Sequence, residues 1–89
     1  MNQELAKRIL SKMSPFHDGV PGNEHYIFAQ YGFYEFEEMS GLSRSDYERF
    51  MVDMGREGWI SIDFKGGIRY EKALISETSD GMIYAGFCN

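Results

Sequence analysis

The stretch Phe36–Ile60, FEEMSGLSRSDYERFMVDMGREGWI, decides the expected fold of this chain. Gly41 can adopt the positive φ that ends a helix, and Ser43 and Asp46 have the spacing of a capping box that starts the next one. Behind that cap, apolar side chains recur at i, i+3, i+4 and i+7; they are Tyr47, Phe50, Met51 and Met54. The stretch therefore predicts two helices joined by a tight turn, with Gly58 closing the second helix before a strand.

The flanking segments complete the expected fold. Leu5, Ile9 and Met13 share one face of a first helix, which ends before Pro15 because proline cannot continue the backbone ladder. Apolar and polar residues alternate from Ile60 to Phe64 and again from residue 68, on either side of a Lys-Gly-Gly turn, which predicts a β-hairpin. We expect helices at residues 2–13, 34–40 and 44–57, strands at 59–64 and 68–75, and a short helix at 79–86. For the last segment a third hairpin strand is the alternative.

The segment between the first helix and the central stretch is less regular. Its Gly and Pro residues predict a loop from Phe16 to Glu24, and the aromatic run from His25 to Tyr34 favours a short strand. The expected core draws on the first three helices, on the turn between the second and third, and on the first hairpin strand. It comprises Leu5, Ile9, Leu10, Phe36, Met39, Leu42, Phe50, Met51, Met54, Ile60 and Ile62.

The order Gly41-Leu42-Ser43, then Gly58-Trp59-Ile60, resembles the winged helix-turn-helix superfamily. With the blocks Glu4–Leu10 and Thr78–Tyr84, the chain also resembles a family of short phage and prophage proteins of uncharacterised function. That resemblance implies one α+β domain over residues 1–89, a small winged helix-turn-helix with three helices, a β-hairpin wing and a short closing helix. Glu77 stands where the family tends to have an apolar residue.

Composition and charge restrict the setting in which the protein works. The chain has 89 residues, enough for one domain, and 14 acidic against nine basic side chains give a net charge of −5, which opposes unspecific attraction to nucleic acid. Five of the acidic residues lie between Pro15 and Leu42, where there is no Lys or Arg, so the acidity is regional. The single cysteine, Cys88, and the absence of a signal-like or membrane-spanning stretch predict a cytoplasmic protein without an internal disulfide or a membrane partner.

Two groups of residues are candidates for binding DNA. In the recognition helix they are Ser43, Arg44, Ser45 and Arg49, and in the wing they are Lys65, Gly66, Gly67, Arg69 and Lys72. Arginines on the helix could reach guanine edges or phosphates, and wing cations beside glycines could contact the DNA backbone. The alternative is a solvated helix face and a charged hairpin tip that serve solubility alone. A DNA-binding form would be a homodimer, because one module buries little interface.

The second hypothesis is an acidic protein-interaction module, such as a phage-encoded inhibitor or adaptor that binds a host protein. Most of the aromatic residues should be core, yet strand alternation cannot bury them all on one face. An aromatic patch framed by carboxylates would then face solvent, and its candidate residues are Tyr31, Tyr34, Glu35, Glu37 and Glu38.

Chemistry at a catalytic or metal site is not expected. His17-Asp18 and Glu24-His25 contain four potential ligands, but they lack the helical His spacing or the Cys pair of a metal site, so we expect polar loop residues. There is no phosphate-binding glycine loop, nucleophile elbow or nucleophile–base spacing. The sequence thus predicts a protein that is not an enzyme, with no catalytic residue, metal, cofactor or small-molecule substrate.

Overall fold

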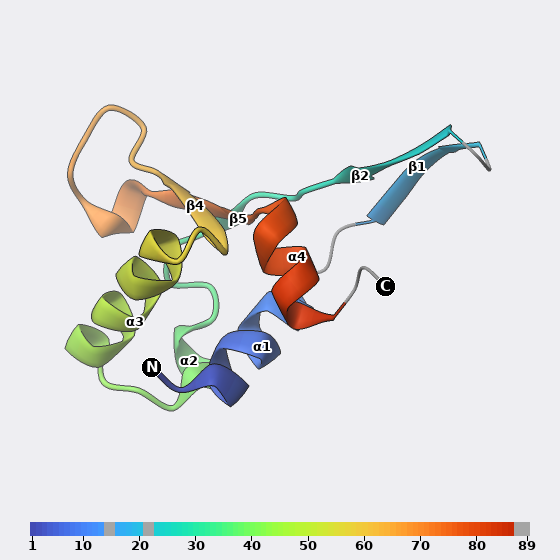
Figure 1. Cartoon of the computed structure of the whole chain (residues 1–89). Coiled ribbons are helices and arrows are strands. Elements are labelled where there is room, and N and C mark those ends of the chain that lie inside the picture. The colour runs from blue at the N-terminus through green and yellow to red at the C-terminus, as the bar shows by residue number, and fades with distance from the viewer. Residues whose placement is uncertain (14–15, 21–22, 87–89) are drawn as a thin grey trace.

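The structure, a computed structural model, describes residues 1–13, 16–20 and 23–86, with the backbone alone for 16–20 and 23–26. Its helices are α1 (Gln3–Lys12), α2 (Glu37–Ser40), α3 (Arg44–Arg56) and α4 (Ser79–Ala85) (Figure 1). Its strands are β1 (Phe16–Val20), β2 (Asn23–Ile27), β3 (Tyr31–Gly32), β4 (Ile60–Asp63) and β5 (Leu74–Glu77). The fold class is α+β, as predicted.

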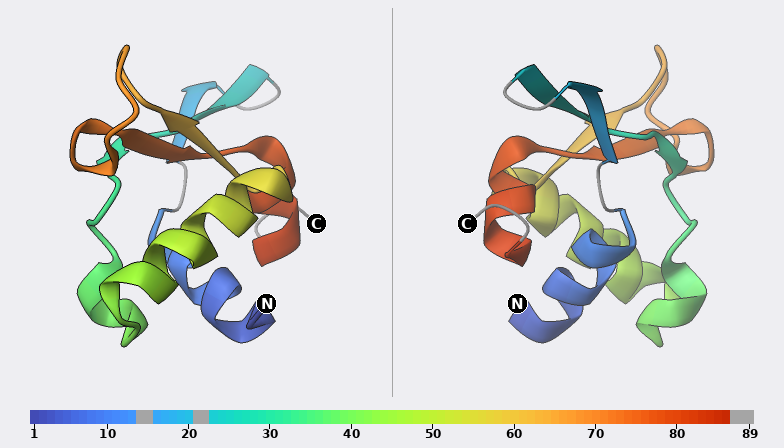
Figure 2. Two further views of the ribbon diagram at one scale, coloured as in Figure 1. Left: turned by 90° about the vertical axis from the view of Figure 1, so that its left-hand side faces the viewer. Right: turned by 90° about the vertical axis from the view of Figure 1, so that its right-hand side faces the viewer.

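Three of the strands form the sheet on which the helices pack. β5 lies in the centre, antiparallel to β3 on one side and to β4 on the other, so that Ile75 is opposite both Tyr31 and Ile62. The helices gather on one side of this sheet (Figure 2). This order of helix, strand, two helices around a turn and two further strands is compatible with the predicted small winged helix-turn-helix. The last element is a helix, so the alternative of a third hairpin strand was wrong.

The turn between α2 and α3 follows the sequence closely. Gly41 has a φ of 71°, and the Ser43 hydroxyl accepts the backbone N–H of Asp46 at 3.3 Å. The helix predicted at 34–40 begins later than expected, because the preceding residues form tight turns in which the Glu37 N–H donates to the Tyr34 carbonyl. α1, α3 and α4 lie close to their predicted bounds.

The wing differs from its prediction. Residues 68–73 are not a strand, and β5 begins only at Leu74. Lys65 and Gly66 both have positive φ, and Tyr70–Lys72 forms a 3-10 turn. The Tyr70 ring stacks on the buried Phe33 ring with centroids 4.6 Å apart. This contact holds the chain out of the sheet, so the apparent alternation after the turn was misleading.

The predicted loop at 16–24 is also wrong, since β1 and β2 form a two-stranded antiparallel ribbon with Asp18 opposite His25. The ribbon projects from the body of the molecule (Figure 1). Gly19 lies within β1, although glycine weakens the interior of a strand. The aromatic run after it contributes the end of β2 and the short β3, and its last residues, Phe33 and Tyr34, lie in the turns before α2.

The core lies between the helices and the sheet. Every predicted core residue is buried or packs half-buried against the buried cluster. The described residues add Ala6, Met13, Phe33, Tyr47, Ala73, Ile75 and Met82 to the buried set. Tyr47 is fully buried because its hydroxyl donates to the Phe33 carbonyl at 2.6 Å, which satisfies the polar end of the ring.

The closing helix α4 packs tightly on the chain at the start of β4. The Thr78 hydroxyl caps α4 by accepting the Gly81 N–H at 3.0 Å, and it donates to the Gly58 carbonyl. The Tyr84 ring stacks on Trp59 with centroids 3.8 Å apart. A Cβ at Gly81 would lie 2.1 Å from the Trp59 carbonyl oxygen, so only glycine permits this approach.

Gly81→Ala should therefore destabilise the fold by about 1–3 kcal/mol, although alanine is the better helix former by about 1 kcal/mol. Urea denaturation would measure the change. Gly32→Ala is the matched control, because a Cβ there meets nothing within 4 Å. Equal stability of the two variants would show that α4 does not pack on Trp59 as described.

Glu77 is a buried carboxylate in the central strand. It is 2% exposed, lies opposite the buried Ile60, and neither of its carboxylate oxygens has a hydrogen-bond partner in the described part of the chain. Burial raises the pKa of Glu77 from its ordinary 4.5 to about 7. The folded protein therefore holds this group protonated at pH values where the unfolded chain has lost the proton.

This difference predicts that the free energy of unfolding falls as pH rises from about 4.5 to about 7, where the folded chain binds more protons than the unfolded one. The contribution of Glu77 to the free energy of unfolding is fully present below pH 4.5 and is lost above about pH 7. The steepest slope should approach about 1.4 kcal/mol per pH unit. Glu77→Gln should remove this slope in chemical denaturation, whereas Glu38→Gln, at an exposed position, should keep it. An unchanged slope in Glu77→Gln would assign the pH dependence to other groups.

Candidate nucleic-acid interface

The two predicted groups of DNA contacts lie on one side of the molecule. α3 and the loop between β4 and β5 both face the viewer in the left panel of Figure 2. We call residues 64–73 the wing loop. All the predicted residues of both groups are exposed: Ser43, Arg44, Ser45 and Arg49 at α3, and Lys65, Gly66, Gly67, Arg69 and Lys72 in the wing loop. A common ligand could therefore reach both.

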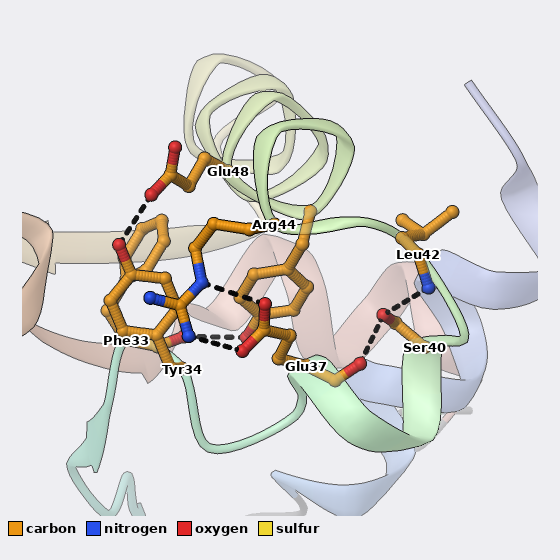
Figure 3. A network of polar contacts seen from close by, with 8 residues as sticks. Phe33, Tyr34, Glu37, Ser40, Leu42, Arg44 and Glu48 are labelled. Carbon is orange, nitrogen blue, oxygen red and sulfur yellow. Dashed lines mark hydrogen bonds and ion pairs between the residues drawn. The ribbon is translucent and has the colours of Figure 1, made fainter.

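Arg44 is already engaged within the protein (Figure 3). Its Nε and Nη2 donate to the two carboxylate oxygens of Glu37 at 2.9 and 2.8 Å, a bidentate pair. The guanidinium also lies 4.0 Å from the centroid of the Tyr34 ring. The hydrogen bond from Arg44 lowers the pKa of Glu37, and the same bond raises the pKa of Arg44. The pair fastens the first turn of α3 to α2.

Tyr34 is held from a second direction. Its hydroxyl donates to the Glu48 carboxylate on the next turn of α3. Burial, followed by the hydrogen bond to Glu48, raises the pKa of Tyr34 to about 12. The pair with Glu37 uses Nε and Nη2 of Arg44, so a base contact by Arg44 would have to come from the guanidinium N–H groups that Glu37 leaves free. The predicted DNA contact of Arg44 stays a prediction, with a structural role beside it.

α3 as a whole offers little net attraction for phosphate. It has three arginines, and four acidic residues lie on the helix and at its C-cap: Asp46, Glu48, Asp53 and Glu57. Arg56 lies 3.8 Å from Asp53. Arg49 is exposed and has no ion-pair partner among the residues that the structure describes. It is therefore the arginine of this helix best placed to contact an external ligand.

The wing loop encloses a surface hollow of about 420 Å³. Three cations and two glycines contribute to its lining; the residues are Phe64, Lys65, Gly66, Gly67, Ile68, Arg69 and Lys72. Lys65 is partly neutralised, because its Nζ lies 3.3 Å from Asp63, whose pKa is lowered by hydrogen bonds from the Lys65 backbone and side chain. Arg69 and Lys72 have no ion pair within the described ranges. The hollow thus combines positive charge with exposed backbone.

The residues of the alternative protein-binding hypothesis are used in different ways. Tyr31 packs edge-on against Phe36, with ring centroids 5.2 Å apart, and Tyr34 and Glu37 belong to the Arg44 network. Glu35 and Glu38 are exposed. The exposed part of that patch is therefore acidic, and its aromatic part mostly supports the fold.

Three features of this region were not predicted from the sequence. They are the tie between Arg44 and Glu37, the hydrogen bond from Tyr34 to Glu48, and the hollow of the wing loop. Arg44 and Glu37 are seven residues apart and lie on different helices, so no helical spacing signals their pairing. The Lys-Gly-Gly turn was the visible signal for the wing, but the position of Tyr70 on Phe33 shapes the loop.

No group of three metal-ligating side chains occurs in the portion that the structure describes. The side chains of His17, Asp18, Glu24 and His25, like Cys88, lie outside that portion. No described helix has the length and apolar character required to cross a membrane. Comparison with protein-family models, curated proteins and solved structures found no match.

The network around Arg44 leads to a stability prediction. Arg44→Ala should lower the denaturation midpoint, because it removes the bond to Glu37 and the contact with Tyr34, whereas Arg49→Ala should leave it unchanged. The difference between the two midpoints should shrink as pH falls through the lowered pKa of Glu37, since protonation of Glu37 removes its ion pair with Arg44. Chemical denaturation of both variants at neutral and acid pH would measure this. Identical midpoints at neutral pH would show that the network contributes nothing to stability.

Proposed function

We propose that this chain binds DNA as a winged-helix module, with its main attraction for the backbone in the wing loop. The observation that carries this proposal is the hollow lined by Lys65, Arg69 and Lys72 beside two glycines. Cations neutralise phosphates, and glycines let the protein backbone approach closely. The exposed face of α3 lies on the same side of the molecule (Figure 2).

α3 and the wing loop differ in net charge, and this difference suggests a different role for each. α3 with its C-cap carries one more acidic than basic group, so it supplies no net attraction. The wing loop has three cations against one acidic residue, Glu71. In this proposal the wing positions the protein on the backbone, while Ser45 and Arg49 on α3 read base edges. A homodimer would double the contacts, and a regulator of phage or prophage origin is the setting that the resemblance implies.

The second candidate function is binding to a host protein. The projecting ribbon of β1 and β2 favours it, because an isolated two-stranded ribbon is marginally stable in water and gains from a partner that pairs with its edges. The exposed Glu35 and Glu38 would add charge complementarity to a basic partner. This candidate requires no contact from the wing loop.

The DNA proposal predicts that Arg69→Ala and Lys72→Ala each reduce the slope of log affinity against log salt concentration by about one unit, for any duplex sequence. Each removes one cation that would contact phosphate. Arg49→Ala should instead weaken discrimination between sequences. Fluorescence titration of a labelled duplex over a salt series would measure both effects. Lys12→Ala, at an exposed cation on α1, is the control and should leave slope and specificity unchanged.

Absence of binding by the folded wild-type protein to pooled genomic duplexes at low salt would overturn this proposal. The host-protein candidate predicts a different result, namely recovery of one host protein in a pull-down. That recovery should be lost on charge reversal at Glu35 and Glu38 and kept in Arg69→Ala and Lys72→Ala.

A further inference from the structure

Ile68 is the apolar residue that the wing loop presents to solvent. Its exposed fraction is 92%, against 53% for Met1, 56% for Ile83 and 38% for Ile27, the other large exposed apolar residues of the described chain. It lies between Gly67 and Arg69, beyond the tight turn at Lys65 and Gly66. Because its side chain stays in water, Ile68 does not gain the free energy that burial gives to other isoleucines, and it contributes nothing to the core.

The surroundings of Ile68 are positively charged. Lys65, Arg69 and Lys72 line the same hollow as Ile68. An apolar side chain among cations complements a ligand with a negative exterior and an apolar interior. Duplex DNA has this construction, since its phosphates flank a stack of bases.

The wing loop is also braced at its base. Phe64 and Tyr70 lie on either side of the loop with ring centroids 5.7 Å apart, and Tyr70 stacks on the buried Phe33. At the tip, a Cβ on Gly66 would meet nothing within 4 Å, so the backbone there is slim and open to approach. The loop thus combines a fixed base with a narrow tip.

We infer that Ile68 is a wedge that inserts between base pairs in the minor groove and kinks the duplex. This inference rests on the proposed DNA binding and adds its mode. Apolar wedges partly unstack a base step and bend the DNA toward the major groove. Pyrimidine–purine steps unstack most readily, so the preferred sites should contain them. The cations around Ile68 would hold the flanking phosphates while the wedge inserts.

Bending can be separated from binding with one duplex labelled at both ends for energy transfer, with 2-aminopurine beside a central TA step. The wild-type protein should bring the two ends closer and raise the 2-aminopurine fluorescence. Ile68→Ser should bind about tenfold more weakly, with the same salt slope and without end-to-end shortening. Ile68→Leu should restore bending. Ile83→Ser, at an exposed isoleucine on α4, should behave as the wild type.

Three outcomes would overturn the inference. If Ile68→Ser bends the duplex as the wild type does, another residue causes the kink. If the wild type binds without bending, no wedge operates, while the proposed DNA binding stands. If the folded wild type binds no duplex at low salt, the proposed function and the wedge fail together.

Discussion

The buried ring of Phe33 is the constraint on which the arrangement of β3, α3 and the wing loop depends. Its backbone N–H donates to the Ala73 carbonyl at 3.1 Å, which joins the end of β3 to the start of β5. Its carbonyl accepts the Tyr47 hydroxyl from α3, and its ring stacks on Tyr70 of the wing loop. Since one residue contacts the sheet, the helix and the wing, the relative positions of these elements are coupled.

This coupling bears on how an acidic protein could bind a polyanion. The net charge of −5 opposes long-range attraction, so binding would depend on where the cations are placed. The wing loop concentrates three of them, and the stacking of Tyr70 on Phe33 holds that loop against the core. On α3, by contrast, Arg44 forms an ion pair with Glu37 and a cation–π contact with Tyr34. In the proposed DNA complex, the wing loop would therefore make more of the contacts to the DNA backbone than α3.

The opposite end of the sheet shows a conflict between charge and packing. α4 needs Gly81 to approach Trp59, and the strand that precedes α4 ends with the buried Glu77. Burial of the Glu77 carboxylate, whose oxygens have no hydrogen-bond partner among the described residues, raises its pKa to about 7. Glu77 thus places an ionisable group at a buried position of the central strand.

The sequence by itself determined the local structure of α1, the α2–α3 turn and α3, and for residues 79–86 it left a helix and a hairpin strand as alternatives. Helix periodicity, the Ser43 cap and the positive φ of Gly41 depend on residues within about one turn of each other, which adjacent sequence makes visible. It also identified most of the core and the cation group of the wing, because these follow from residue type and spacing.

Only the tertiary structure decided the shape of the wing loop, the pairing of β1 with β2, the tie of Arg44 to Glu37, and the burial of Glu77. Tyr70 continues an alternating pattern that favours a strand, but its stacking on Phe33, 37 positions earlier, removes the chain from the sheet. The bond from Arg44 to Glu37 likewise joins groups on different elements. Such contacts depend on how the elements meet in space, and local spacing carries no information about that meeting.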